Sequence, residues 1–143
     1  MATANPTLTF NGIAEEAFTF YQSVFGCEFT SLMRYSSIPG AEKWPPSEAN
    51  RIAHIALPIG KSNVLMGGDA PSSFGLLEQG KNFAIELECE SKEEASKLYY
   101  ALAKGGEEDP MMPLGDAFWG AYYGQLTDKF GIRWMVNYTY PKK

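Results

Sequence analysis

The chain has 143 residues, of which 45% are hydrophobic and 20% charged, and its formal net charge is -5 at pH 7. The length suits one domain or two small halves, and the apolar content excludes an intrinsically disordered chain. Because Lys142-Lys143 is the only local basic cluster, we expect no nucleic-acid partner, and no apolar run approaches the roughly 20 residues that span a bilayer. The first residues lack the pattern of a signal peptide, so we expect a cytoplasmic location and no membrane partner.

The first half of the chain reads as a strand, a helix and three further strands. Leu8 and Phe10 alternate with threonines, which is typical of a strand with one buried face. A helix is predicted over 14–25, because its apolar residues follow helical spacing and Gly26 ends it. The later strands are expected at Glu28–Tyr35, Arg51–Ile59 and Asn63–Gly67, with an irregular Pro-rich loop over 37–50.

The second half repeats this order after a linker over residues 69–80. An alternating strand at Asn82–Glu90 precedes a helix that opens with the capping box Ser91-Lys-Glu-Glu94. Three strands are expected at Glu108–Leu114, Trp119–Thr127 and Ile132–Tyr138. The helices align 78 residues apart, Tyr21 with Tyr99, and the last two strands align 68 apart, His54 with Tyr122 and Met66 with Trp134. The sequence therefore predicts two βαβββ modules, about 5–69 and 81–140, that pack as a single domain because each is small.

This tandem repeat resembles the vicinal oxygen chelate superfamily, which includes glyoxalase I, bleomycin-resistance proteins and extradiol dioxygenases. More closely it resembles the PhnB-like branch, also described as a 3-demethylubiquinone methyltransferase-like domain. The resemblance implies an α+β fold in which the modules form a split, barrel-like sheet with a central cleft and the helices outside, and it implies a homodimer. The residues that carry it are Leu8-Thr-Phe-Asn-Gly12, Ala17-Phe-Thr-Phe-Tyr21, Phe25-Gly26, Ile52-Ala-His-Ile55, Phe118-Trp119 and Thr127-Asp-Lys-Phe-Gly-Ile-Arg-Trp-Met135.

Catalytic members of this superfamily take His and Glu metal ligands from the first and last strands of the modules. By rough alignment those places are held here by Pro6 or Thr7, Met66, Asn82 to Ala84, and Met135. Proline and methionine offer a hard divalent cation no useful ligand. We therefore predict no metal site and no cofactor, and a divalent metal held by His54 with Glu86 or Glu88 is the less favoured alternative.

His54 is the one histidine of the chain, and it lies in the middle of a predicted strand. Alternation places it on one face with Ile52 and Ala56, and the opposite, fully apolar set should contact the helix. His54 would then face the cleft as a general base or a polar anchor for a ligand. The other interpretation is a structural histidine that is hydrogen-bonded within the sheet.

Glu86 and Glu88 share the face of their strand that points away from the helix. Two carboxylates at this spacing could bind a cation or transfer a proton, with Arg34 or Arg133 as a charge partner. A solvated outer edge explains them equally well. Glu86 is, with His54, the candidate for a catalytic role.

The segment Phe118-Trp-Gly-Ala-Tyr-Tyr123 is rich in aromatic residues, which suit the lining of a planar or apolar ligand site as well as packing between modules or subunits. Trp44, in the Pro-rich loop, could cover the cleft mouth or a dimer partner. The predicted ligand-binding residues are Thr9, His54, Met66, Glu86, Trp119, Tyr122 and Trp134.

Three functions stay open. The favoured one is a small-molecule-binding protein of the PhnB-like, glyoxalase-fold type that lacks the usual metal ligands. The second is a metal-dependent or acid–base lyase, isomerase or dioxygenase of the same superfamily, and the third is a structural or interaction dimer without a ligand. Methyltransferase activity is not favoured, because the elements do not form the glycine-rich opening of a doubly wound sheet.

Overall fold

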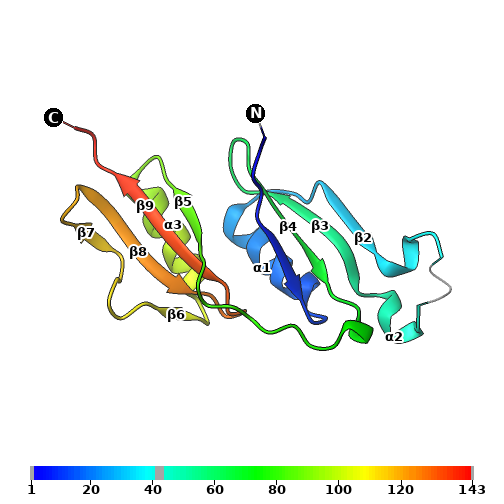
Figure 1. Ribbon diagram of the computed structural model, residues 1–143. Helices are drawn as coiled ribbons and strands as arrows, with labels where there is room; N and C mark the ends of the chain where they lie inside the picture. The colour runs from blue at the N-terminus through cyan, green and yellow to red at the C-terminus, as the bar shows by residue number, and fades with distance from the viewer. Residues whose placement is uncertain (1, 41–43, 143) are drawn as a thin grey trace. The chain divides into compact units, whose positions relative to one another are not determined.

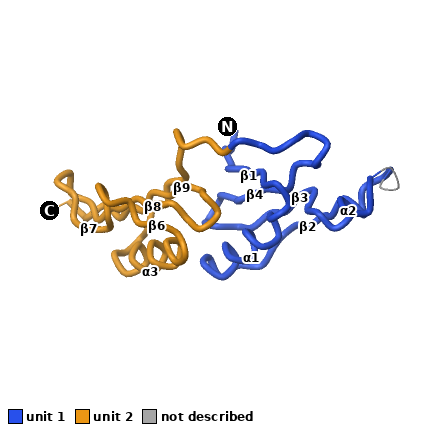
Figure 2. The backbone as a smooth tube through the Cα atoms, turned by 90° about the horizontal axis from the view of Figure 1, so that it is seen from below, with its two compact units in different colours: residues 1–78 blue, residues 79–143 orange. Residues whose placement is uncertain are grey.

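The computed structural model describes residues 2–40 and 44–142, which form two compact units, residues 1–78 and 79–143. In unit 1, helix α1 (Ala14–Phe25) lies behind a four-stranded sheet in Figure 1, and Figure 2 shows it on one side of the strands. The sheet order is β1-β4-β3-β2, with β1 parallel to β4 and the other pairs antiparallel. The strands are β1 (Thr7–Phe10), β2 (Ser31–Arg34), β3 (Ile52–Pro58) and β4 (Val64–Asp69), and the short helices are η1 (Tyr35–Ser37), α2 (Pro46–Ala49) and η3 (Ser72–Phe74).

The core of unit 1 lies between α1 and this sheet. The buried face of α1 carries Ala14, Ala17, Phe18, Tyr21 and Val24, the stripe that the helical spacing predicts. Gly26 ends the helix in the left-handed conformation, with φ 72°, and its N–H donates to the Gln22 carbonyl at 2.8 Å. Buried strand residues on the sheet include Leu8, Ile55, Leu57 and Leu65.

The buried carboxylate of Asp69 joins three segments of unit 1. Its Oδ1 accepts the backbone N–H groups of Gly12 and Ala14 at the start of α1, each at 2.9 Å, and its Oδ2 accepts that of Ile52 at 2.9 Å. The N-cap residue of α1, Ile13, provides no side-chain hydrogen bond. Asp69, at the end of β4, therefore replaces the local cap that a helix start usually has.

β4 passes so close to α1 and β1 that position 67 has no room for a side chain. A Cβ there would lie 2.6 Å from the Leu8 carbonyl oxygen and 2.7 Å from the Phe18 ring. We expect Gly67→Ala to lower the free energy of unfolding, measured by urea denaturation, by about 1–3 kcal/mol. Gly60→Ala, where a Cβ would meet nothing within 4 Å, is the matched control. Equal stabilities of the two variants would contradict the close contact.

Unit 2 has one long helix, α3 (Lys92–Ala103), on one face of a five-stranded sheet. The sheet order is β5-β9-β8-β6, and β7 also pairs with β8. The predicted capping box is confirmed: Ser91 Oγ accepts the Glu94 N–H at 3.0 Å, and Glu94 Oε1 accepts the Glu90 N–H at 2.9 Å. The strands are β5 (Ile85–Glu88), β6 (Glu107–Glu108), β7 (Gly115–Ala117), β8 (Ala121–Thr127) and β9 (Arg133–Thr139).

The strand expected at Glu108–Leu114 is wrong, because β6 ends at Glu108 and β7 begins only at Gly115, with a turn between them. Pro110 and Pro113 lie in this turn and have no N–H for a sheet ladder. The Asp109 carboxylate instead accepts the N–H groups of Met111 and Met112, at 2.8 and 3.3 Å. Turn bonds therefore interrupt the ladder with β8, where the Asp109 N–H donates to the Gln125 carbonyl at 3.0 Å and the Met112 carbonyl accepts the Gln125 N–H at 2.8 Å.

The α+β fold of two repeated units is confirmed, with βαβββ order in unit 1 and, in unit 2, the first strand after the helix divided into β6 and β7. Each unit holds an open sheet rather than a closed barrel. The 68-residue alignment of the last strands is one residue too short. β1 places Thr7 beside Met66, and β5 places Glu86 beside Met135, in the same parallel arrangement. Met66 therefore corresponds to Met135 and not to Trp134, and His54 corresponds to Tyr123 and not to Tyr122. Successive side chains along a strand point to opposite faces of the sheet. The one-residue error in the alignment therefore assigns Tyr122 and Trp134 to the wrong face.

Within residues 2–40 and 44–142, none of the helices has the combination of length and hydropathy that a membrane-spanning helix needs.

Candidate functional site

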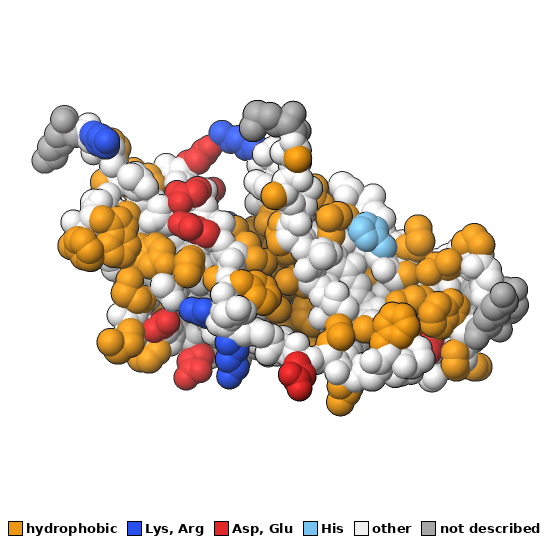
Figure 3. Space-filling model, in the orientation of Figure 1, with side chains coloured by type: hydrophobic (Ala, Val, Ile, Leu, Met, Phe, Trp, Pro, Cys, Tyr) orange, Lys and Arg blue, Asp and Glu red, His pale blue; other side chains and the backbone are white. Residues whose placement is uncertain are grey.

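Each unit has one sheet face that its long helix does not cover, which we name the open face of that unit. Strand pairing places Thr7, Met66 and Ala56 side by side on the open face of unit 1, with Thr9 next to Gly68. Thr9 is exposed and Met66 is half-buried. Figures 1 and 3 view this face from the front.

His54 lies on the open face of unit 1, paired with Met33 of β2. Its side chain is half-buried, and it is the pale blue group visible on the surface in Figure 3. Among the described residues no hydrogen bond to the imidazole is present. The interpretation of His54 as a histidine fixed by hydrogen bonds within the sheet is therefore not supported.

A register shift beside His54 corrects the predicted alternation of its strand. Arg34 pairs with Ile52 and Met33 with His54, so Ala53 has no partner on β2. Such a bulge interrupts the alternation of side chains between the two faces. Ile52, predicted to share the face of His54, is instead 1% exposed and belongs to the core.

The open face of unit 2 carries a short grid of polar residues around Met135. The strand pairing places Glu86, Met135 and Gln125 in one row across β5, β9 and β8. The next row holds Glu88, Asn137 and Tyr123, and Arg133 lies beside Thr127 at the other end of β9. Met135 is half-buried and lies at the centre of this face.

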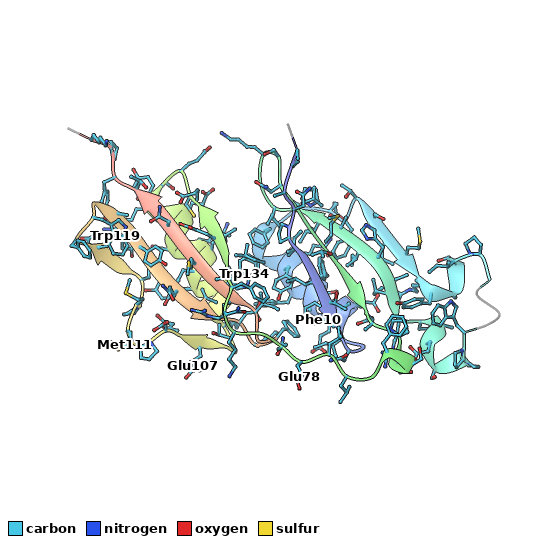
Figure 4. The ribbon with its side chains drawn as sticks, in the orientation of Figure 1. Phe10, Glu78, Glu107, Met111, Trp119 and Trp134 are labelled. Atoms are coloured by element: carbon cyan, nitrogen blue, oxygen red, sulfur yellow. The ribbon has the colours of Figure 1, made fainter. Side chains whose placement is uncertain are left out.

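Three of these side chains form a hydrogen-bonded chain. Arg133 donates from Nη1 to the Lys81 carbonyl at 2.9 Å and from Nη2 to Gln125 Oε1 at 3.3 Å. Gln125 Nε2 donates to the Tyr123 hydroxyl at 2.9 Å. The Tyr123 ring packs against Trp119, with 5.4 Å between ring centroids, and Trp119 lies in the turn between β7 and β8, where Figure 4 labels it.

The two glutamates of β5 are exposed and lie side by side along the strand. Asn137 Nδ2 donates to both carboxylate oxygens of Glu88, at 3.1 and 3.0 Å. Partial burial, followed by the hydrogen bond and charge of Glu88, raises the pKa of Glu86. Of the two predicted charge partners, Arg34 pairs with Glu15, and Arg133 bonds to neutral oxygens.

The raised pKa of Glu86 makes a testable difference to stability. A carboxyl whose pKa is higher in the folded than in the unfolded chain loses stability as the pH rises through that interval. We expect Glu86→Gln to raise the Tm at pH 7, and the gain to vanish at about pH 4, below the ordinary pKa of glutamate. Thermal unfolding of the wild type and the variant between about pH 4 and pH 7 measures this change in Tm. Glu78→Gln, at another exposed glutamate, is the control. A gain that does not change with pH would contradict the assignment.

Tyr122 and Trp134, predicted as ligand-binding residues, lie on the face of unit 2 that α3 covers. The Tyr122 hydroxyl is hydrogen-bonded to Ser96 of α3 at 3.3 Å, and Lys92 of α3 lies over its ring. Trp134 is fully buried, and its Nε1 donates to the buried carboxylate of Asp128 at 2.9 Å. Trp134 is labelled in Figure 4. Both side chains therefore pack between the sheet of unit 2 and α3, and not on the open face.

The other predicted residues divide between the two units. Thr9, His54 and Met66 lie on the open face of unit 1, and Glu86 and Trp119 lie in unit 2. Trp44 packs on Tyr35 within unit 1, with ring centroids 4.8 Å apart. The open-face residues Tyr123, Gln125, Arg133 and Met135 were not predicted as ligand contacts, although a repeat alignment one residue longer would have selected Tyr123 and Met135.

Comparisons with known proteins agree with this fold. The family model described as 3-demethylubiquinone-9 3-methyltransferase matches residues 2–137. Protein PA1353 from Pseudomonas aeruginosa is 36% identical with a TM-score of 0.84, and the match covers 97% of this chain and 98% of that one. A putative 3-demethylubiquinone-9 3-methyltransferase, PhnB protein, from Bacillus cereus is 25% identical with a TM-score of 0.73, over 96% of this chain and all of the other. Protein YjdN from Escherichia coli (strain K12) is 29% identical over 93% of this chain and 92% of its own length.

More distant structures share the fold alone. A glyoxylase/bleomycin resistance protein/dioxygenase domain from Frankia sp. EAN1pec is 11% identical with a TM-score of 0.69. The fosfomycin resistance protein FosX from Listeria monocytogenes, in complex with Mn(II) and sulfate, is 12% identical with a TM-score of 0.63. The chain therefore belongs to the family described as 3-demethylubiquinone-9 3-methyltransferase, with a PhnB protein among its relatives, and it shares the fold of glyoxalase/bleomycin resistance/dioxygenase proteins.

Proposed function

We propose that the chain is a small-molecule-binding protein whose open sheet faces contact the ligand and which holds no divalent metal at the positions that catalytic relatives use. The observation that carries this proposal is the composition of those positions. Strand pairing places a methionine at the centre of each open face, Met66 beside Thr7 and Met135 beside Glu86. Thioethers and a half-buried aromatic surface favour the binding of an organic molecule over the binding of a hard cation.

A metal of the kind present in the FosX complex does not fit these residues. A hydroxyl and a thioether are weak partners for Mn²⁺, and Glu86 alone is one carboxylate. Within residues 2–40 and 44–142, no three His, Cys, Asp or Glu side chains lie close enough together to hold an ion.

An acid–base enzyme is the second candidate, and it rests on His54. This half-buried imidazole lies on an open face without a hydrogen-bond partner among the described residues, so it is free to exchange a proton with a bound molecule. Methyl transfer, which the family description names, is not favoured, because each sheet is mixed with one long helix rather than doubly wound. A cytoplasmic location and a homodimer stay predictions from the sequence.

Thermal unfolding with a panel of small organic compounds tests the proposal. We expect at least one compound to raise the Tm in the presence of EDTA, since a ligand that binds only the folded state stabilises it. Met135→Ala should reduce that rise, whereas Met111→Ala, at an 83% exposed position, should leave it unchanged. A Tm rise that disappears with EDTA would favour the metal enzyme, and no rise across the panel would favour the dimer without a ligand.

A further inference from the structure

We propose that the open face of unit 2 recognises an organic carboxylate through the Arg133 guanidinium and the Tyr123 hydroxyl. This inference rests on the proposed small-molecule binding and names the chemical class of ligand. Arg133 differs from Arg34 and Arg51, which form ion pairs with Glu15 and Glu48. Arg133 instead bonds to two neutral oxygens, so its positive charge is not neutralised by a carboxylate in the described part of the chain.

The directions of the hydrogen bonds leave specific donors for a ligand. A guanidinium only donates, so the Gln125 atom that faces Arg133 must be the carbonyl oxygen, and its NH₂ group must face Tyr123. The Tyr123 hydroxyl accepts that bond and therefore directs its own proton elsewhere. Arg133 uses two of its five N–H groups in these contacts, and the others remain for a ligand. Gln125 is thus a positioning residue that holds both donors on one side of the face.

The surroundings favour an anion attached to a flat apolar body. Trp119 is 49% exposed beside the Tyr123 ring, and Met135 lies between Gln125 and Glu86. The carboxylates of Glu86 and Glu88 are on β5, about 10 Å from β8 across β9. They repel an anion over β5 and so favour its placement over β8, with the apolar part resting on Met135 and Trp119.

The test compares benzoate with the neutral benzamide by NMR titration of the full chain at pH 7. We expect benzoate to bind at least about tenfold more tightly than benzamide, and Arg133→Met to remove that preference. Lys97→Met removes one positive charge from an exposed position of α3. It is the matched control and should keep the preference for benzoate. Gln125→Glu, which would pair with Arg133 and accept the Tyr123 proton, should remove the preference as well.

Equal binding of benzoate and benzamide, or a preference that survives both Arg133→Met and Gln125→Glu, would overturn the inference and leave the proposed function in place. Binding of other panel compounds without any binding of benzoate would overturn it in the same way. If no compound of either kind binds, both the inference and the proposed function fail.

Discussion

Replacing Asp69 with Ala is expected to lower the free energy of unfolding by about 3–5 kcal/mol. The substitution leaves three backbone N–H groups, those of Gly12, Ala14 and Ile52, without their acceptor in a part-buried to buried region. It removes at once the cap of α1 and the bond that ties β4 to the start of β3. Urea denaturation followed by circular dichroism measures the loss.

Two further variants make this prediction specific. Asp69→Asn should cost nearly as much as Ala, because one carboxylate oxygen becomes an NH₂ group that faces a backbone donor. Asp109→Ala is the matched control, since Asp109 also accepts two backbone N–H groups but in an exposed turn, and it should cost about 1 kcal/mol or less. If Asp69→Ala is no more costly than Asp109→Ala, Asp69 is not the cap of α1.

Trp134→Ala is expected to destabilise the protein by about 3–5 kcal/mol, because the side chain is fully buried and fills the space under α3. Trp134→Phe keeps most of the ring but leaves Asp128 Oδ2 without the indole N–H, and it should cost about 1–3 kcal/mol. Denaturant unfolding of the same three proteins, wild type and both variants, gives these values.

Trp119→Ala is the control for this pair, since Trp119 is 49% exposed and contacts Phe118 and Tyr123 by ring edges. Trp119→Ala should lower the free energy of unfolding by about 1 kcal/mol or less, and it should weaken ligand binding instead. A larger loss of stability at Trp119 than at Trp134 would reverse the assignment of the two sheet faces.

The helices of this protein could be predicted from local patterns. The apolar stripe from Ala14 to Phe25 and the Ser91 capping box determine α1 and α3 almost to the residue, because both signals lie within a few turns of the chain. The turn at Asp128-Lys-Phe-Gly131 is likewise local: Gly131 has φ 86° and donates to the Asp128 carbonyl at 2.9 Å.

The sheet faces could not be predicted in the same way. The repeat alignment of the last strands was one residue short, and this exchanged Trp134 for Met135 and Tyr122 for Tyr123. An apolar tryptophan fits a ligand surface or a core equally well from sequence, and only the bond to Asp128 and the contacts of α3 separate the two. The cap of α1 was also hidden, because Asp69 lies 55 residues from Ala14 in the chain.

The candidate site was predicted in part for the same reason. The predicted ligand contacts Thr9, His54, Met66 and Glu86 do lie on the open faces, although the bulge beside His54 breaks the alternation predicted for its strand. The Arg133–Gln125–Tyr123 chain joins β9 to β8, so its members become neighbours only once strand register is known.

Whether the open faces bind organic ligands and not a divalent ion can be read from NMR spectra of the protein labelled with ¹³C at the methionine methyl groups. Met66 and Met135 report on the two open faces, and the exposed Met111 serves as an internal control. We predict that a panel compound shifts the Met66 or Met135 signal, and that equimolar Mn²⁺ alone broadens neither more than Met111. Selective broadening of the Met66 or Met135 signal by Mn²⁺ would contradict the claim.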